Sequence, residues 1–378
     1  MLNEIYKIKD SIDVFVSETE SPEKVLVIFH KMTTRDRIEM IAGKPVAEFL
    51  ALLNGRRTIL DVLNELGNVD VNEASKLIQF LLDQRLIIRL AEIGGEDSRY
   101  KRQIAYFDDL ILERPGQRTQ KLLQTKHVTV LGCGGVGGAI AETLARVGVG
   151  GIKLFDYKRV LEGNLGRDTY SQVGDLGKPK VEVLKSFLER INHEITVSVV
   201  EDMLLPYTDL TQWIPSNTNL VVNTCDEPYI GHTSLKLGRF LQAQGIPLYV
   251  AGGFDAHLMS SGELIYPPLT PCIDCAQKTF TNALGEWKPT YISVPDGEEE
   301  LAREVAFEKN YILGGSGGCA AISAFSAHLA SLRIIEFLSE DSAINFDTVR
   351  HEYLINSGHV TDFQMKKQDE CHVCNIKT

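Results

Sequence analysis

The fold is decided by His127-Val-Thr-Val-Leu131, an apolar run that leads directly into the G-x-G-x-x-G motif Gly132-Cys-Gly134-Gly-Val-Gly137. The apolar run is typical of a buried strand, and residues 139–147 continue as a helical pattern. Gly151-Ile-Lys-Leu-Phe155 then predicts a second strand, with Asp156 directly after it. Together these segments predict a βαβ unit, the repeating element of a parallel sheet.

The spacing of this motif indicates a phosphate-binding turn. Its glycines let the backbone turn tightly and approach phosphate oxygens, and the N-terminus of the following helix stabilises their negative charge. Asp156 lies 24 residues after Gly132 and can accept hydrogen bonds from ribose hydroxyls. A glycine-rich turn alone also serves close helix packing, but with strand, helix and acid in place we predict nucleotide binding.

The residues that follow Asp156 favour ATP over NAD, the nucleotide that this motif usually indicates. Arg167 and Lys180 add positive charge that a dinucleotide needs little of, whereas a triphosphate under attack needs cations on the oxygens that gain charge. Asp226 follows the strand 220–225, where a doubly wound sheet presents its ligands, and a hard carboxylate there suits magnesium. A charged residue of this kind, taken singly, is more often a surface charge than a ligand. The common position of these residues after predicted strands is what supports an ATP site.

Strands and helices continue to alternate toward the C-terminus. Apolar strand runs recur at 220–223 and 248–250, and helical patterns at 181–191 and 320–338. Alternation of this kind predicts a parallel sheet covered by helices on both faces. We therefore expect residues 126–378 to form an α/β domain with a Rossmann-like doubly wound sheet.

Residues 1–90 predict a smaller domain of their own. Strand runs at 5–8, 13–16 and 25–29 precede three helical patterns, at 46–53, from Thr58 with Asp61 as its capping partner, and from Asn72. Residues 86–90 return to strand. This order predicts a winged-helix-like α+β domain.

Residues 91–125 separate the two predicted domains. They are polar and contain Gly94-Gly95 and Pro115-Gly116, which are typical of loops. We expect a linker here.

Composition excludes several functions. The chain has 378 residues and a formal net charge of −12, which opposes binding to nucleic acid or anionic lipid. Its start lacks an apolar signal region, and no stretch reaches about 18 uncharged apolar residues. We expect a cytoplasmic protein that binds neither nucleic acid nor membranes.

The cysteines predict a metal site. Seven cysteines without a signal peptide argue against a disulfide framework. Four of them form two C-x-x-C pairs, Cys272 with Cys275 and Cys371 with Cys374, and four thiolates at this spacing can close a tetrahedral shell around zinc. A redox pair would need only one such motif. Packing is the expected role of the other three, which are Cys133, Cys225 and Cys319.

The motifs occur in the order found in ThiF/MoeB-type adenylating enzymes, relatives of ubiquitin-activating enzymes, and the chain resembles this family over about residues 98–375. The resemblance implies that ATP and magnesium are used, and that a carboxylate attacks the α-phosphorus to release pyrophosphate. It implies a nucleotide-binding role for Gly132, Gly134, Gly135, Gly137 and Asp156, phosphate contacts from Asn164, Arg167 and Lys180, magnesium binding by Asp226, and a structural zinc on Cys272, Cys275, Cys371 and Cys374.

Further implications concern subunits and departures from the family pattern. Arg99-Tyr-Lys-Arg102 is similar to the segment whose second arginine enters the partner subunit's site, which makes Arg102 a catalytic candidate and implies a homodimer. Asp168 replaces the usual glutamine after the arginine. The crossover stretch 276–318 contains no cysteine, whereas members that form a thioester or persulfide normally keep one there.

The N-terminal domain resembles PqqD-type domains that recognise leader peptides, and the whole chain resembles the MccB-type and pantocin-type peptide-modifying members of the family. This implies ATP-dependent adenylation of a C-terminal or glutamate carboxylate in a ribosomally made precursor peptide. An intramolecular nucleophile then completes a peptide antibiotic. The main alternative is an adenylyltransferase for the C-terminal Gly-Gly of a sulfur carrier, and a DNA-binding regulator is a more distant one.

Overall fold

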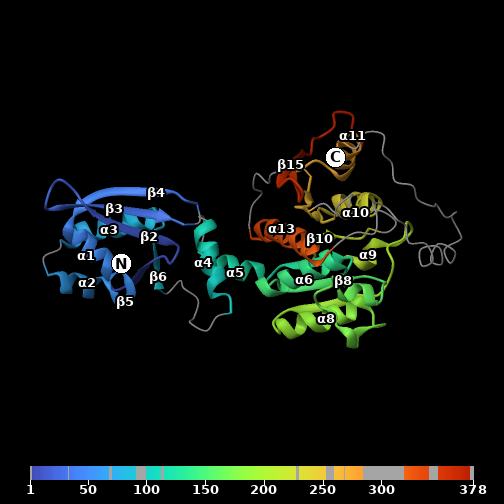
Figure 1. Ribbon diagram of the computed structural model, residues 1–378, viewed down its shortest axis with the longest axis horizontal. Coiled ribbons are helices and arrows are strands. Elements are labelled where there is room, and N and C mark those ends of the chain that lie inside the picture. Colours follow the sequence, from blue (N-terminus) through green and yellow to red (C-terminus); the bar gives the residue numbers. More distant parts are fainter. Residues whose placement is uncertain are drawn as a thin grey trace. The chain divides into compact units, whose positions relative to one another are not determined.

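The computed structural model describes residues 2–32, 34–67, 70–90, 99–111, 115–226, 230–252, 259–267, 269–283, 319–339 and 348–374. They form two compact units, Met1–Leu122 and Leu123–Thr378 (Figure 1).

The N-terminal unit contains two small antiparallel sheets and a set of helices. One sheet has the order β2-β3-β4, and the other β5-β1-β6. Its elements are β1 (Ile5–Ile8), β2 (Ile12–Glu18), β3 (Lys24–Lys31), β4 (Arg37–Gly43), α1 (Lys44–Leu52), β5 (Asn54–Thr58), α2 (Ile59–Leu66), α3 (Val71–Asp83), β6 (Ile87–Arg89), α4 (Lys101–Leu110) and α5 (Gly116–Leu123).

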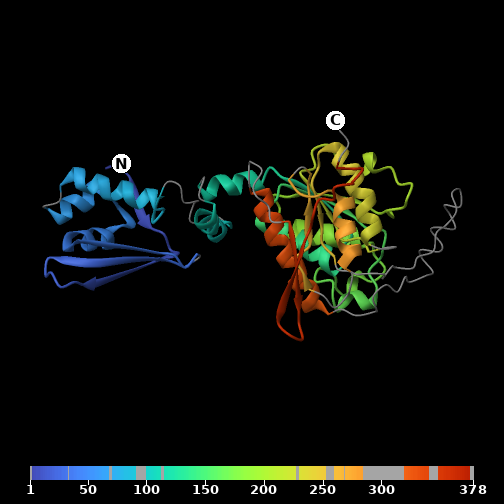
Figure 2. The same cartoon turned by 90° about the horizontal axis from the view of Figure 1, so that it is seen from above.

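The sheet β2-β3-β4 covers the core with one face only. Alternate residues of β3, namely Val25, Val27 and Phe29, are buried in the unit's core. Phe15 of β2 and Ile41 of β4 remain 54% and 66% exposed. Figure 2 shows helices of this unit on one side of the sheet. Because β3 is central, the strands with open edges are β2 and β4.

Local signals predicted the second and third helices of this unit. Thr58 caps α2: its hydroxyl accepts from the backbone of Asp61 at 3.2 Å, and the Asp61 carboxylate accepts from the backbone of Thr58 at 3.0 Å. The third helix begins at Val71, one residue before the predicted Asn72. Of its predicted apolar face, Ala74 and Leu81 are buried and Leu77 packs against the core, but Phe80 is 36% exposed and Ile78 takes the buried position.

Two strands and two helices of this unit escaped the sequence analysis. The strands are β4 and β5. The helices α4 and α5 lie in the stretch predicted as a polar linker, where Ile104 and Phe107 are buried. The Lys9 ammonium donates to the backbone carbonyl of Asp108 at 2.7 Å, so α4 is tied to the start of the chain.

The C-terminal unit is built on a six-stranded sheet with the order β13-β11-β10-β7-β8-β9. Its strands pair in parallel apart from β13, which pairs antiparallel with β11. The strands are β7 (His127–Leu131), β8 (Gly151–Phe155), β9 (Thr196–Val200), β10 (Leu220–Asn223), β11 (Leu248–Val250) and β13 (Glu263–Ile265). This is the doubly wound sheet that the sequence predicts, and β7 and β10 mark the point where the strand order reverses.

Helices cover this sheet on both sides. They are α6 (Gly135–Val147), α7 (Glu162–Leu165), α8 (Lys180–Ile191), α9 (Leu210–Trp213), α10 (Ile230–Gln244), α11 (Ile273–Ala283) and α13 (Ala320–Leu338). Right-handed crossovers from β7 to β8 and from β10 to β11 run in opposite directions, which puts α6 and α10 on opposite faces. Helix α6 packs between α8 and α13 on one face, and α10 packs with α11 on the other (Figure 1).

A second small sheet, β12-β14-β15, completes the unit with β12 (Met259–Ser260), β14 (Val349–Leu354) and β15 (His359–Gln364). Helix α13 packs against β12 as well as α6. By length and composition alone α13 meets the criteria for a membrane span, with 39% of it buried inside the unit. It carries Arg333 and Glu336, so no run of 18 uncharged residues is present in it.

Candidate active site

The glycine-rich turn lies between β7 and α6, and its shape requires glycine. Gly132 has a φ of +90°, and a side chain at Gly137 would collide with the carbonyl oxygen of Gly132. Two hydroxyls hold the turn. Thr224 donates to the carbonyls of Leu131 at 2.9 Å and Gly132 at 3.0 Å, and Tyr170 donates to that of Cys133 at 2.5 Å.

Cys133 is a packing residue within this turn. Its side chain is buried, and burial raises the pKa of the thiol well above its usual range. A thiol of that kind is a poor nucleophile at neutral pH.

Asp156 lies at the end of β8, beside the turn. Its carboxylate accepts from the backbone of Cys133 at 2.7 Å and of Lys158 at 2.8 Å. Burial raises the pKa of Asp156, and the two backbone hydrogen bonds oppose that effect. The side chain also lines the adjoining cavity, where its remaining lone pairs can accept from hydroxyl groups.

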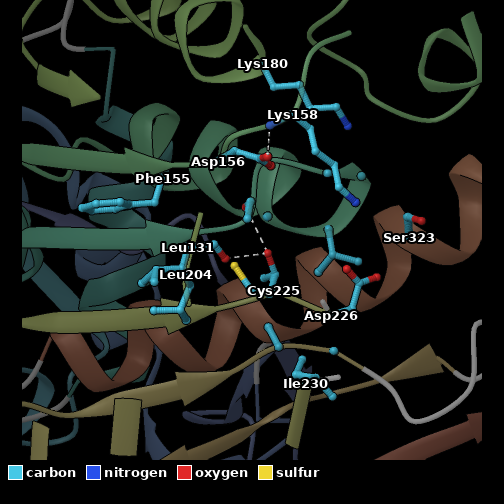
Figure 3. A pocket seen from close by; sticks show the side chains of 18 of the residues that line it. Leu131, Phe155, Asp156, Lys158, Lys180, Leu204, Cys225, Asp226, Ile230 and Ser323 are labelled. Carbon is cyan, nitrogen blue, oxygen red and sulfur yellow. Dashed lines mark hydrogen bonds between the residues drawn. The ribbon is translucent and has the colours of Figure 1, made fainter. Parts of the chain in front are cut away.

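A cavity of about 270 Å³ opens where β7, β8 and β10 end. The glycine turn forms its floor, and the N-terminal part of α13 contributes Ile322, Ser323 and Ser326. Figure 3 shows Phe155, Leu131 and Leu204 on one side of it and Lys158 and Lys180 on the other. This is the location at which open α/β sheets bind ligands.

One end of the cavity is apolar. Phe155 stacks on Trp213 with ring centroids 4.6 Å apart, and Leu204 and Leu131 lie near Phe155 in Figure 3. All four side chains line the cavity. Flat apolar walls of this kind accommodate a nucleobase.

Positive charge gathers beyond the glycine turn. Arg167, Lys158 and Lys180 all line the cavity, and Figure 3 shows both lysines on the side away from Phe155. The side-chain carbons of Arg167 lie close against Gly135, where a Cβ would come within 2.8 Å of them. Lys180 begins α8 with its side chain only 4% exposed, and its ammonium donates to Asp168 at 2.8 Å.

The structure places most of the predicted site residues around this cavity. Asp226 is exposed at its rim, with Cys225 next to it. Asn164 is not among the lining residues: its side-chain oxygen accepts from the backbone of Leu161 at 2.8 Å. Arg102 is exposed on α4 and belongs to the N-terminal unit.

The four predicted zinc ligands converge in the C-terminal unit. Their sulfur atoms all lie within 4.8 Å of one another, with Cys272 and Cys371 3.5 Å apart and Cys275 and Cys374 3.6 Å apart. A tetrahedral zinc with bonds of about 2.3 Å needs sulfur atoms about 3.8 Å apart, so the cluster can hold this ion.

The other two cysteines outside the cluster lie in different settings. Cys225 lines the cavity, and Cys319 is exposed at the start of α13. The packing role predicted for Cys319 is therefore wrong. The rest of the predicted crossover, residues 284–318, lies outside the described part of the chain.

The sequence analysis missed several residues of the cavity. Lys158 follows Asp156 by only two positions, so its closeness to this predicted site residue could have indicated that it lines the cavity. Trp213 and Ser323 arrive from distant elements, and no local pattern marks them.

Comparison with known proteins identifies the family. A model of the ThiF family matches residues 100–373. The chain is 31% identical to tRNA threonylcarbamoyladenosine dehydratase of Escherichia coli, over 36% of this chain and half the length of that relative. It is 32% identical to the molybdopterin-synthase adenylyltransferase of the same organism, over 52% of this chain and 74% of the relative.

Among solved structures, E. coli MccB with ATP superposes with a TM-score of 0.69 at 20% identity, covering 98% of this chain and 99% of MccB. The shared fold therefore includes the N-terminal unit. The chain belongs to the ThiF family, and its C-terminal unit has the architecture of the ATP-dependent adenylyltransferases in that family.

Proposed function

We propose that this protein is an ATP-dependent adenylyltransferase that activates a carboxylate of a ribosomally made precursor peptide. The observation that carries the proposal is the cavity, whose apolar end fits a base and whose cationic end fits phosphates, with Asp156 between them. The peptide is supported by the fold shared with MccB over both units, because other structures of MccB contain MccA.

In the proposed reaction, a carboxylate oxygen of the peptide attacks the α-phosphorus of ATP. The bond from that phosphorus to the bridging oxygen breaks, and pyrophosphate leaves with the electron pair, so the products are acyl adenylate and pyrophosphate. An intramolecular nucleophile, such as an amide nitrogen, then displaces AMP. Which carboxylate and which nucleophile take part depends on the peptide.

Each described group has a place in this reaction. Asp156 accepts from the ribose, and Arg167, Lys158 and Lys180 neutralise charge that develops on the phosphates. Asp226 would hold magnesium, which supplies further positive charge to the phosphates when bound. The turn amides at the N-terminus of α6 add fixed dipoles that need no reorganisation.

The N-terminal unit is proposed to capture the peptide as a PqqD-like domain. The sheet β2-β3-β4 has open edges at β2 and β4, and an extended peptide can add to such an edge through main-chain hydrogen bonds. Holding a leader segment there raises the effective concentration of the reactive carboxylate. We further propose a cytoplasmic homodimer with one structural zinc per chain, in which Arg102 serves the partner's site.

A sulfur-carrier adenylyltransferase is the second candidate, favoured by 32% identity to the molybdopterin-synthase enzyme. Isotope exchange between ATP and pyrophosphate separates the two candidates. We expect exchange with Mg-ATP and a precursor peptide encoded beside the gene, and none with a carrier ending in Gly-Gly. Exchange with the carrier alone would establish the second candidate.

A further inference from the structure

Asp168 is a fully buried carboxylate directly behind the phosphate end of the cavity. Its side chain is 0% exposed. The backbone fixes its position, because its N–H donates to the carbonyl of Asn164 at 2.7 Å and its carbonyl accepts from the N–H of Ser171 at 3.1 Å. A buried carboxylate is costly to desolvate unless it is paired.

Two cations of the cavity flank this carboxylate. Oδ2 accepts from the Lys180 ammonium at 2.8 Å, and Oδ1 lies 3.7 Å from Nε of Arg167. Oδ1 has no hydrogen-bond partner within the part of the chain that the structure describes. Asp168 itself is not among the cavity-lining residues, whereas Lys180 and Arg167 both are.

This arrangement fixes where the Lys180 ammonium can point. An ammonium has three donors, so the hydrogen bond to Asp168 leaves two for other acceptors. Because the lysine side chain is only 4% exposed, these donors have little access to bulk water and face the cavity instead. The carboxylate also compensates the lysine charge when no nucleotide is bound.

We propose that Asp168 is a positioning residue that holds Lys180, and through it the cationic end of the cavity, in the geometry that stabilises the phosphates during transfer. The proposal rests on the proposed adenylation only for the identity of the reaction. Its core is that Asp168 acts through Lys180, and nucleotide binding alone can test that.

The test is a double-mutant cycle with Asp168→Asn and Lys180→Gln. Asparagine keeps the shape of the side chain and one acceptor but removes the charge. In the parent background, Asp168→Asn should lower the exchange rate at saturating ATP about tenfold or more. The dissociation constant for ATP should stay within about threefold, because the lysine is retained but no longer held.

In the Lys180→Gln background, Asp168→Asn should cause no further loss of rate. The double variant should bind ATP more tightly than Lys180→Gln alone, since that single change leaves an unpaired buried carboxylate near the phosphates. Losses that multiply in the double variant would show that Asp168 acts independently and would overturn the proposal. So would an Asp168→Asn protein that weakens ATP binding as much as Lys180→Gln does.

Lys178→Gln is the matched control. Lys178 lies two residues before Lys180 in the sequence, and its ammonium pairs with Asp175 at 2.9 Å. Its side chain is 57% exposed and does not line the cavity. This variant should leave rate and affinity unchanged. If the parent shows no exchange with any carboxylate substrate, the proposed function fails. ATP affinities then still test the pairing of Asp168 with Lys180, because tighter binding by the double variant than by Lys180→Gln supports it and equal affinities of these two proteins overturn it.

Discussion

At the scale of single residues, Trp213 should report directly on the apolar end of the cavity. The chain has two tryptophans, Trp213 and Trp287. Because Trp213 stacks on Phe155 and lines the cavity, a base that enters there changes its surroundings. We expect ATP to change the intrinsic fluorescence of a Trp287→Phe protein, in which Trp213 is the remaining tryptophan. An unchanged spectrum of this variant at saturating ATP would contradict binding at this end.

Cys371 should determine whether the chain retains zinc. Burial opposes ionisation of this thiol, but hydrogen bonds from Cys374 and the neighbouring thiols lower its pKa to about 7. Burial raises the pKa of Cys275 to about 11, so a metal ion must displace protons from the cluster. Cys371→Ser should lose the metal and unfold at lower temperature, because structural zinc is worth about 10 to 16 kcal/mol in small domains.

The pH dependence has a definite sign. Protons compete with zinc for the four thiolates, because only the deprotonated sulfur binds the metal. Zinc release into a coloured chelator should therefore rise on acidification. Cys319→Ala is the control for Cys371→Ser. Cys319 is exposed and lies outside the cysteine cluster, so this variant should keep parental zinc content and activity. Parent protein that purifies without zinc would refute the zinc site.

Site residues that belong to local motifs could be predicted from the sequence. Residues whose role comes from contacts with distant parts of the chain could not. Gly132, Asp156 and Asp226 follow strands, and their positions could be inferred from alternation alone. Asp168 was visible only as a departure from a family pattern, because its role depends on Lys180, 12 residues away along the chain. Asn164 fitted the pattern, yet in the structure its side chain caps a short helix.

At the scale of elements, the exposed edges of the N-terminal sheet are the proposed peptide site. Charged side chains on an edge strand discourage pairing with a further strand. Phe15→Lys combined with Ile41→Lys places a charge on both edge strands at exposed positions, so the fold should persist. We expect peptide binding to weaken about tenfold with ATP affinity unchanged, as measured by calorimetry.

Leu60→Lys combined with Val71→Lys provides the matched control for this experiment. Leu60 is 42% exposed on α2 and Val71 is 45% exposed on α3, so this pair adds the same two charges away from both edge strands. Equal weakening by this control would mean that net charge, not strand addition, governs binding. Unchanged peptide affinity in the double variant would contradict peptide binding at the edges of this sheet.

Elements that pack against distant segments were the hardest to predict. Strand β4 was invisible because its alternating residues are mostly half-exposed and its role as an edge depends on pairing with β3. The helix α4 lies in a polar stretch, whose many charged and amide side chains obscured the helical spacing of its buried residues Ile104, Phe107 and Asp108. By contrast, β7, β8 and β10 are buried on both faces and read as continuous apolar runs, as parallel strands do.

At the scale of the whole molecule, the proposed dimer makes Arg102 a residue that completes the partner's site. Arg102→Ala and Asp226→Ala proteins should each be nearly inactive alone. Mixing them under conditions of subunit exchange should restore up to about a quarter to a half of the activity, because a mixed dimer owns one intact site. Absence of complementation despite proven exchange would contradict an arginine that acts across subunits.

The central claim is that a peptide carboxylate attacks the α-phosphorus of ATP in the cavity of the C-terminal unit. The most direct measurement uses a precursor peptide with ¹⁸O in its carboxylates, followed by mass spectrometry of the nucleotide products. If the carboxylate forms an acyl adenylate that a nucleophile then displaces, one labelled oxygen must appear in AMP, and the pyrophosphate must be unlabelled. Label in inorganic phosphate together with ADP, or AMP without label, would contradict the account.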